Sequence, residues 1–594
     1  MSSNAPAAPA ASFAASFEAD WARLLPGLQA RYATALPELC VPWRATPVPQ
    51  PRLQVFNAAL ALELGWPDEA LNTPLAAPLW AAHALPPGAQ PVAQGYAGHQ
   101  FGGYSPQLGD GRALLLGEVR DVHGQWRDVA FKGSGRTPFS RGGDGKAALG
   151  PMLREYLMSE ALHALGVPTT RSLAVASTGE TIWRDSGPLP GAVLTRVAAS
   201  HIRVGTFQWV AARGDTDLLR RLADFTLALH DPHIAQAHPD GQAPSQAAAP
   251  VAPPSGPAST ANPTGNPYLA LLAAVCQRQA DLLARWMGLG FIHGVMNTDN
   301  MTLSGGTIDY GPCAFMEGFD PGAVFSSIDR DGRYAWGNQP AMAQWNLARL
   351  AEALLPLLDA DADRAVALAT AELDRFADRY TRCWHRVQGA KLGLWPWPWG
   401  AARSGHPPAT EPVTNPAATP APGPSTPQAD PPHGWPDPTP ADAALLADWQ
   451  ALLAGDAGAP GVDWTLAHRL LGDAADPDHP TALARLRALW PDPTALDRWL
   501  PRWRQRLAPP AATAQPGGWA AVSQALRRVN PLYIPRNHSV EAALAAASER
   551  GDLGPFHQLL AAVQHPFDER PDLAALAQPA PAAWTARHRT FCGT

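Results

Sequence analysis

The chain has 594 residues, of which 46% are hydrophobic, a composition typical of a globular protein with more than one domain's worth of core. A formal net charge of -7 gives no basic footprint, so nucleic acid is not expected as the main partner. The five cysteines form no CxxC pair, and no apolar run reaches about 20 residues. We therefore expect a reducing, cytoplasmic setting and no membrane span.

Residues 1–90 are expected to form an N-terminal extension that is largely helical. Trp21, Leu24, Leu25 and Leu28 have the spacing of one helix face. The segment carries no recognisable chemistry, so we expect it to pack on the outside of the catalytic unit.

A glycine-rich stretch at residues 95–118 leads into a strand-like apolar run at 113–116. Glycines let a backbone approach phosphates closely and adopt turns with positive φ. An ordinary hairpin turn at 109–111 would explain the same glycines. Arg112 beside that turn favours a phosphate-binding loop, because a guanidinium can bind phosphate in a bidentate manner.

The next predicted strand, 126–131, ends in Lys132. A strand-borne lysine one hairpin after a glycine-rich turn is where protein kinases place their phosphate-holding lysine, although a solvated strand end is commoner for any single lysine. The run 149–165 has helical periodicity and carries Glu155 and Glu160, which lie about 140° apart at roughly 100° per residue. Only one can face the lysine, and we predict that Glu155 does.

Strands at 171–177 and 191–197 are expected to complete an antiparallel sheet. Arg196 and Arg203 lie near its end, where they would suit a polyphosphate, although surface salt bridges would explain them equally well. With the preceding elements, residues 91–234 form the predicted N-lobe of a kinase-like fold.

Residues 291–310, FIHGVMNTDNMTLSGGTIDY, gather carboxylate and amide side chains, the hard oxygen ligands that Mg²⁺ takes alongside water. The stretch resembles the catalytic and metal loops of the protein-kinase-like fold, His-x-Asp-x-x-x-x-Asn followed by Asp-Phe-Gly. His293 and Asn300 keep the first spacing, and Asp309 opens the metal-binding triplet.

The usual catalytic aspartate is missing from this loop, because Val295 stands at its position. Either the protein is catalytically dead or the chemistry has moved. Asp299, next to Asn300, is the predicted relocated carboxylate.

The remaining chain divides by composition. Ala, Pro and Ser dominate a predicted low-complexity insertion and a Pro-rich linker, whereas helical periodicity marks the segments around them. The expected parts are the insertion 235–267, a helical C-lobe 268–402, the linker 403–440, and a C-terminal helical region 441–594 that ends near Cys592.

These motifs together resemble the selenoprotein O family, also called the YdiU family, of kinase-like protein nucleotidyltransferases. The strings that carry the resemblance are GHQFGGYSPQLGDGR, FKGSGRTPFSRGGDG, HGVMNTDNM and IDYGP, with further matches at 530–538 and near Cys592. The resemblance implies transfer of AMP from ATP, sometimes UMP from UTP, to Ser, Thr or Tyr hydroxyls of proteins with Mg²⁺ or Mn²⁺. It also implies that ATP lies reversed relative to a kinase.

The resemblance implies roles for individual residues as well. Asp299 would be the proton acceptor, beside Lys132 and Glu155 of the kinase arrangement, and Asn300 and Asp309 would be the metal ligands. Cys592 would form a redox-regulatory bond, for which Cys313 is one candidate partner. The implied nucleotide contacts are Gly109, Gly111, Arg112, Lys132, Asp144, Gly145, Arg196, Arg203 and Asp309.

The expected fold class is therefore α+β: a protein-kinase-like bilobal fold with an antiparallel β N-lobe and a helical C-lobe, flanked by N-terminal and C-terminal helical extensions. Two other functions stay open. One is a kinase-like phosphotransferase acting on a small molecule, and the other is an inactive pseudokinase scaffold, which Val295 motivates.

Overall fold

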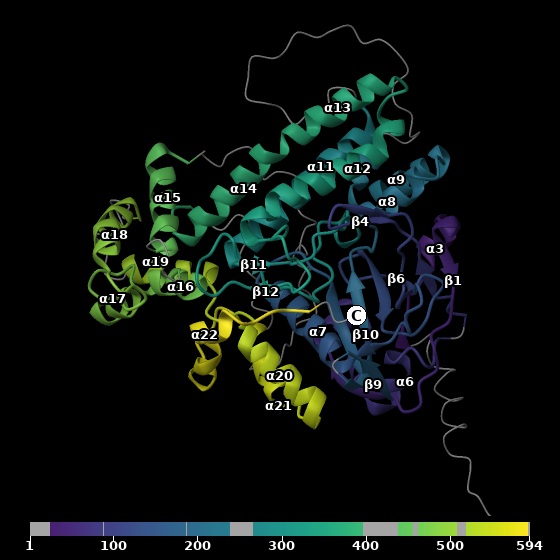
Figure 1. Ribbon diagram of the computed structural model, residues 1–594, viewed down its shortest axis with the longest axis horizontal. Helices are drawn as coiled ribbons and strands as arrows, with labels where there is room; N and C mark the ends of the chain where they lie inside the picture. Colours follow the sequence, from purple (N-terminus) through teal and green to yellow (C-terminus); the bar gives the residue numbers. More distant parts are fainter. Residues whose placement is uncertain are drawn as a thin grey trace, which may run out of the picture.

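The computed structural model describes residues 24–86, 88–185, 187–237, 265–395, 438–455, 461–507 and 518–591. Most of the predicted insertion and linker, and Cys592, lie outside these ranges. Within them the fold is α+β with antiparallel sheets, which confirms that part of the prediction (Figure 1).

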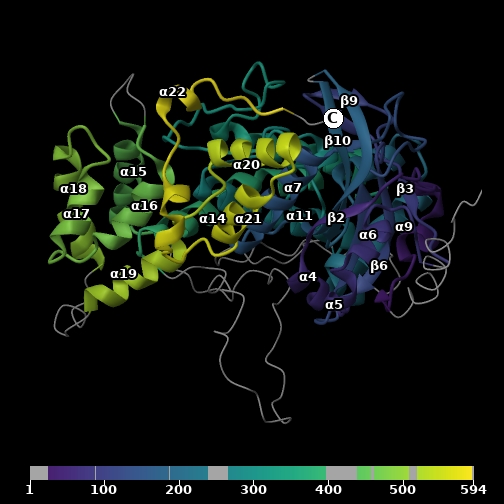
Figure 2. The ribbon, with the colours of Figure 1, turned by 90° about the horizontal axis from the view of Figure 1, so that it is seen from below.

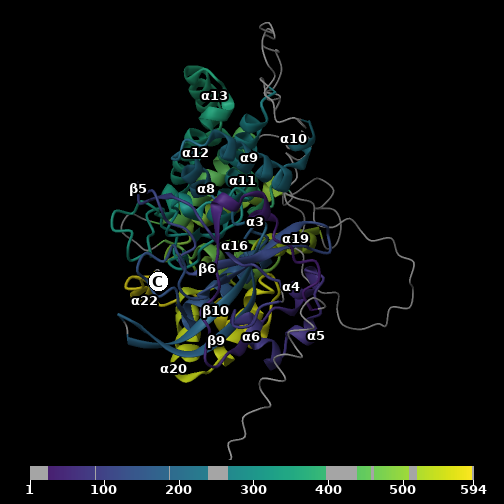
Figure 3. The same cartoon turned by 90° about the vertical axis from the view of Figure 1, so that its right-hand side faces the viewer.

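In the described part of the chain, eight strands form one antiparallel sheet in the order β1-β3-β6-β7-β10-β9-β2, with β8 paired to β10. Figure 3 shows helices stacked above the strands of this sheet. The strands are β1 (Cys40–Pro42), β2 (Arg52–Phe56), β3 (Val92–Gln94), β6 (Ala113–Arg120), β7 (Trp126–Lys132), β8 (Ala147–Ala148), β9 (Arg171–Arg184) and β10 (Gly187–Ala198).

The two edge strands of the sheet come from the predicted N-terminal extension. That segment was expected to pack outside the catalytic unit, and neither strand was predicted. β1 and β2 are only three and five residues long, too short to show a clear period-two pattern. The segment also contributes α3 (Arg31–Ala35), α4 (Ala58–Glu63), α5 (Asp68–Leu71) and α6 (Ala77–Trp80), with the 3-10 turns η1 (Pro37–Leu39) and η2 (Pro74–Ala76).

Helix α7 (Leu149–Ala164) packs between the sheet and two C-terminal helices, α20 (Asn537–Arg550) and α21 (Gly554–Val563). Most of its residues are buried, including Arg154, Glu155 and Glu160. A buried charge requires ion pairs and hydrogen bonds to offset its lost hydration. Helix α7 is therefore where polar partners matter most.

The helices of residues 204–391, called the middle region here, stack beyond the sheet (Figures 1 and 3). Four helices lie in the described part of residues 268–402, the region expected to be helical. None of the helices in the described ranges has the length and apolarity that crossing a bilayer requires. The helices of this middle region are α8 (Val204–Ala211), α9 (Thr216–His230), α10 (Pro232–Ala237), α11 (Pro267–Leu289), α12 (Gln339–Leu358), α13 (Ala362–Asp374) and α14 (Phe376–Lys391), with η3 (Thr298–Asn300) and η4 (Trp336–Asn338).

The helices of residues 440–529 form a bundle at the end of the molecule opposite the sheet (Figure 2). Its core is rich in tryptophan, and the buried Arg536 pairs with Glu317 and Asp463 to join it to the middle region. Its elements are α15 (Pro440–Ala454), α16 (Trp464–Asp473), α17 (Pro480–Arg487), α18 (Thr494–Leu507) and α19 (Gly518–Val529). The chain after α21 adds η5 (Pro571–Ala577) and α22 (Ala582–Thr585).

Two small antiparallel pairs lie outside the main sheet. β11 (Phe291–Ile292) pairs with β12 (Ala314–Phe315) around the predicted metal loop, and β4 (Gly98–Gln100) pairs with β5 (Gly103–Ser105). Both pairs bring loop residues to the candidate site.

Candidate active site

Lys132, the last residue of β7, lies at the centre of a buried charge network. Its ammonium group donates to the carboxylate of Glu155 on α7 and lies 3.6 Å from the carboxylate of Asp309. Burial raises the pKa of Glu155, but the charges of Lys132 and Arg196 outweigh it and hold the pKa below its ordinary value. The predicted pairing of Lys132 with Glu155, and not with Glu160, is confirmed.

Two buried arginines extend this network. Arg196 donates from Nη1 to Glu155 at 3.3 Å and from Nε to the ring of His201 at 3.1 Å. Arg203 donates from Nε to the carbonyl of His201 at 3.2 Å and lies 3.7 Å from Asp110. The surface salt-bridge alternative is wrong, because the two arginines are only 4% and 6% exposed.

Asp309 adopts a strained backbone conformation beside these cations. Its φ of 69° lies in the left-handed region that residues other than glycine rarely adopt, and such strain clusters at functional sites. Burial raises the pKa of its carboxyl, but Lys132, Arg112, His293 and Arg196 hold it well below its usual range. Asp309 is therefore a permanent anion at neutral pH.

Asp299, in the 3-10 turn η3, is a second buried carboxylate with different surroundings. Its Oδ2 accepts a hydrogen bond from Gln100 at 3.2 Å, and its buried Oδ1 has no partner. Burial raises its pKa to about 6, against smaller opposing effects that include Arg203. A carboxylate with a pKa near neutrality and an unpartnered oxygen is suited to accept a proton.

The neighbouring loop positions are filled by apolar and amide groups. Val295, at the place of the usual catalytic aspartate, is 4% exposed and packs in the core. Asn300 donates from its amide nitrogen to the carbonyl of Val295 at 3.1 Å, which leaves its oxygen as the atom that could bind a cation.

No group of three or more His, Cys, Asp and Glu side chains in the described ranges forms a metal site by itself. A cation here would need the oxygens of Asp309 and Asn300 together with phosphates and water, which is the usual Mg²⁺ arrangement. The donor set fits a nucleotide-bound metal and not an all-protein cage.

The glycine-rich loop approaches the network through Arg112, whose carbonyl accepts from the backbone N–H of Gly133 at 2.7 Å. Gly109 has a φ of 93°, and a Cβ there would lie 2.5 Å from Cγ of Phe139, so only glycine fits. Gly111 is the next glycine of the same loop. The structure therefore places this loop against β7 at the end that carries Lys132.

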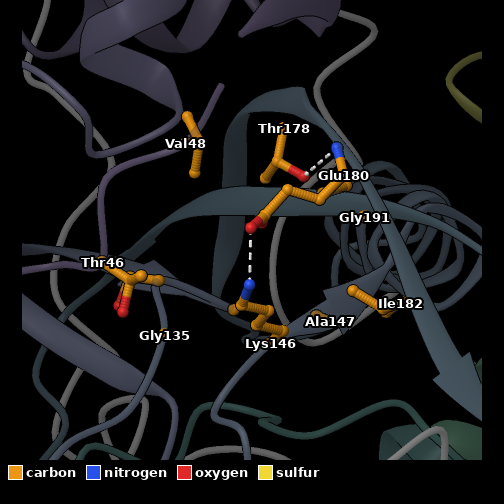
Figure 4. A pocket seen from close by; sticks show the side chains of 12 residues that line it. Thr46, Val48, Gly135, Lys146, Ala147, Thr178, Glu180, Ile182 and Gly191 are labelled. Carbon is orange, nitrogen blue, oxygen red and sulfur yellow. Dashed lines mark hydrogen bonds and ion pairs between the residues drawn. The ribbon is translucent and has the colours of Figure 1, made fainter. Parts of the chain in front are cut away.

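Asp144 and Gly145 lie in a second loop. The carboxylate of Asp144 accepts from Arg184 at 2.8 and 3.1 Å, so its ion pair is not with the Lys132 network. Gly145 has a φ of 68°. The next residue, Lys146, points toward Glu180 at 2.5 Å in a small pocket that residues 133–135 also line (Figure 4).

Three polar residues that shape the site had no predicted role. Arg154 on α7 donates to the carbonyls of Tyr310, Gly311 and Cys313, which holds the backbone that follows Asp309. His201 joins the two arginines, and Gln100 contacts Asp299. The signals were present, because Arg154 precedes Glu155, His201 lies between the two arginines, and Gln100 belongs to the string GHQFGG.

Cys313, the candidate partner of Cys592, is a buried free thiol that donates to the carbonyl of Tyr310 at 3.2 Å. Burial raises its pKa to about 12. Because Cys592 lies outside the described residues, their pairing stays a prediction.

The chain that carries this charged site is also closely similar in sequence to known enzymes. Relatives named protein nucleotidyltransferase YdiU include one from Cereibacter sphaeroides, 52% identical over 563 residues that cover 95% of this chain and 98% of the relative. One from Chromobacterium violaceum is 51% identical over 94% of this chain and 100% of its own length, and one from Mycobacterium sp. is 49% identical over 96% and 99%.

These similarities place the chain in the class of protein nucleotidyltransferases. The family model described as protein adenylyltransferase SelO matches residues 28–564, and the chain belongs to this family. The family expected from the motifs is therefore confirmed.

Proposed function

We propose that the enzyme transfers AMP from ATP to a Ser, Thr or Tyr hydroxyl of a protein and releases pyrophosphate. The observation that supports this most is the separation of two acidic centres. Asp309 lies among cations with a strongly lowered pKa, whereas Asp299 has a pKa of about 6 and an unpartnered oxygen. Metal binding and proton acceptance would then fall on different carboxylates.

In this mechanism the acceptor oxygen attacks the α-phosphorus of ATP. The bond from oxygen to Pα forms, the bond from Pα to the bridging oxygen of the β-phosphate breaks, and Asp299 takes the hydroxyl proton. Arg112, Lys132, Arg196 and Arg203 would hold the phosphates of the reversed nucleotide and stabilise the negative charge on the departing pyrophosphate.

Asn300 and Asp309 would hold Mg²⁺ or Mn²⁺, which when bound supplies positive charge to the phosphate oxygens. The chain prepares both ligands. The amide of Asn300 is oriented by its hydrogen bond to Val295, and Asp309 stays ionised through its cationic neighbours.

Further parts of the proposal concern the nucleotide and the architecture. Gly109, Gly111, Asp144 and Gly145 would contact the nucleotide, with UTP as an alternative donor. The arrangement would be kinase-like, with residues 91–234 and 268–402 as its two lobes, which the pairing of the β7 lysine with the α7 glutamate supports. The cytoplasmic setting stays a prediction.

The test compares ATP labelled at the α-phosphate with ATP labelled at the γ-phosphate, using the wild-type protein and Asp299→Ala. We expect α-label on protein, and we expect Asp299→Ala to keep its ATP affinity and to lose this labelling. Transfer of γ-label to a small molecule would instead indicate a phosphotransferase. ATP binding without transfer of either label would favour the pseudokinase scaffold.

A further inference from the structure

The β4–β5 hairpin covers the loop that carries Asp299. Three consecutive hairpin residues donate hydrogen bonds to residues 297–299, about two hundred positions further along the chain. The bonds run from His99 N to Thr298 Oγ1 at 2.7 Å, from Gln100 Nε2 to Asp299 Oδ2 at 3.2 Å, and from Phe101 N to Asn297 Oδ1 at 3.1 Å.

The hairpin is held in this place from two sides. Gln208 on α8 donates to the ring of His99 at 2.7 Å and accepts from the hydroxyl of Thr298 at 2.7 Å. The backbone also approaches very closely at Gly98, where a Cβ would lie 2.8 Å from Oδ1 of Asp299 and 2.9 Å from Leu108. The position of Gln100 is thus fixed by its surroundings and not by its own rotamer alone.

The two oxygens of Asp299 therefore differ. Oδ2 is committed to Gln100, whereas Oδ1 is buried without a partner. The terminal torsion of an aspartate is broad, so a single hydrogen bond to one oxygen decides where the other one points. Residues that fix a catalytic group in this way act through preorganisation.

We propose that Gln100 is the positioning residue of the proton acceptor: its amide holds Oδ2 of Asp299 and so fixes the orientation of the carboxylate that takes the proton of the acceptor hydroxyl. This inference rests on the proposed function, in which Asp299 is the base. Gln100 touches neither nucleotide nor acceptor in this scheme and acts only through Asp299.

The test is Gln100→Met in the full-length protein, which keeps the side-chain volume and removes the donor, with Gln505→Met as the matched control. Gln505 is exposed on α18, in the helical bundle at the other end of the molecule. We expect transfer of α-label to fall by roughly 10- to 100-fold, with ATP affinity unchanged. The loss should fall on kcat and leave KM for ATP unchanged, and the control should match wild type.

A wild-type rate in Gln100→Met would overturn the inference. A slower rate accompanied by weaker ATP binding would also overturn it, because that pattern indicates a merely structural hairpin. Gln100→Glu serves if the methionine variant does not fold: it keeps the side-chain shape without the amide donor, so transfer should fall as in Gln100→Met, and a wild-type rate there contradicts the role.

Failure of the proposed function gives a different result. If Asp299→Ala transfers α-label at the wild-type rate, the base has been assigned wrongly, whatever Gln100 does. If Asp299→Ala is inactive and Gln100→Met is normal, only the positioning role fails. In the Asp299→Asn background, Gln100→Met should cause no further loss, because both act on one step.

Discussion

Two glutamates on α7 have nearly equal burial and opposite surroundings. Glu155 and Glu160 are each 3% exposed, and cationic partners lower the pKa of each against the effect of burial. The carboxylate of Glu160 accepts four hydrogen bonds. Two come from Arg171 at 2.8 Å, one from Asn57 at 2.8 Å, and one from the backbone N–H of Ser172 at 3.1 Å. Its partners join α7 to the sheet.

Glu155 shares its partners instead. Lys132 also faces Asp309, and Arg196 also bonds to His201. Arg171, the partner of Glu160, has only the half-exposed Glu63 as a second acid, whereas the second acid of Lys132 is Asp309 in the site. A cation shared with a second acid of the site can take part in binding a third anion. Burial and a shifted pKa alone therefore do not identify a functional carboxylate. The sharing of its cation with a second acid of the site does.

The largest expected effect is on stability, in Glu160→Gln. Removal of this charge leaves Arg171 buried with only the half-exposed Glu63 at 3.3 Å, so we expect a loss of about 3 kcal/mol in the free energy of unfolding. Urea denaturation measures it. A loss below about 1 kcal/mol would mean that the pair is not a structural lock.

Glu155→Gln should affect the rate of transfer more than the stability. Lys132 keeps Asp309 as a partner, so we expect a smaller loss of stability than in Glu160→Gln. Misplacement of the lysine by about 1 Å should slow transfer of α-label by about 100-fold. Equal rates in the two variants, corrected for the folded fraction, would remove the distinction between the two glutamates.

Asp299 differs from both glutamates, because its partners do not offset the effect of burial on its pKa. Its pKa of about 6 lies above the ordinary 3.8, so its ionisation destabilises the folded protein. That destabilisation is absent below the ordinary value, grows as the pH rises toward 6 and is complete above it. We expect Asp299→Asn to be more stable than wild type by about 1 to 2 kcal/mol at neutral pH.

The measurement is urea denaturation of both proteins near neutral pH and near pH 4. The gain in stability should shrink to well under about 1 kcal/mol near pH 4, because Asp299 is then protonated in the folded state and ionised only in part in the unfolded state. A gain that keeps its full size there would come from the hydrogen bonding of the new amide and not from the charge.

Local patterns predicted the parts of this site that follow one another in the chain. The order of a glycine loop, a lysine strand and a helix led to the pairing of Lys132 with Glu155, and the 3.6-residue period gave the helices to within a few positions. The structure buries both Val295 and Asp299. The relocation of the catalytic acid from the first position to the second stays a prediction.

The sequence could not show contacts between distant segments. Gln100 and Asp299 are 199 positions apart, and neither residue carries a local signal of the other. The ion pair of Asp144 with Arg184 was not predicted for the same reason, because it depends on how the β9–β10 hairpin lies over the second loop. A resemblance can assign Asp144 to a nucleotide, but only the packing reveals its competing partner.

That competition gives the smallest expected effect. Asp144 is far more exposed than either glutamate: its side chain is 45% exposed, and its partner Arg184 is 21% exposed. An exposed pair contributes little, so Asp144→Ala should cost less than about 1 kcal/mol of stability.

If Asp144 contacts the nucleotide, the same variant should bind ATP about 5-fold more weakly, the equivalent of one modest hydrogen bond. The matched control is Glu180→Ala, which breaks the Lys146 pair beside the same loop and keeps Asp144. Calorimetric titration with ATP and Mg²⁺ separates the two. An unchanged affinity in Asp144→Ala would assign Asp144 to loop geometry and leave phosphate binding to the shared cations of the Lys132 network.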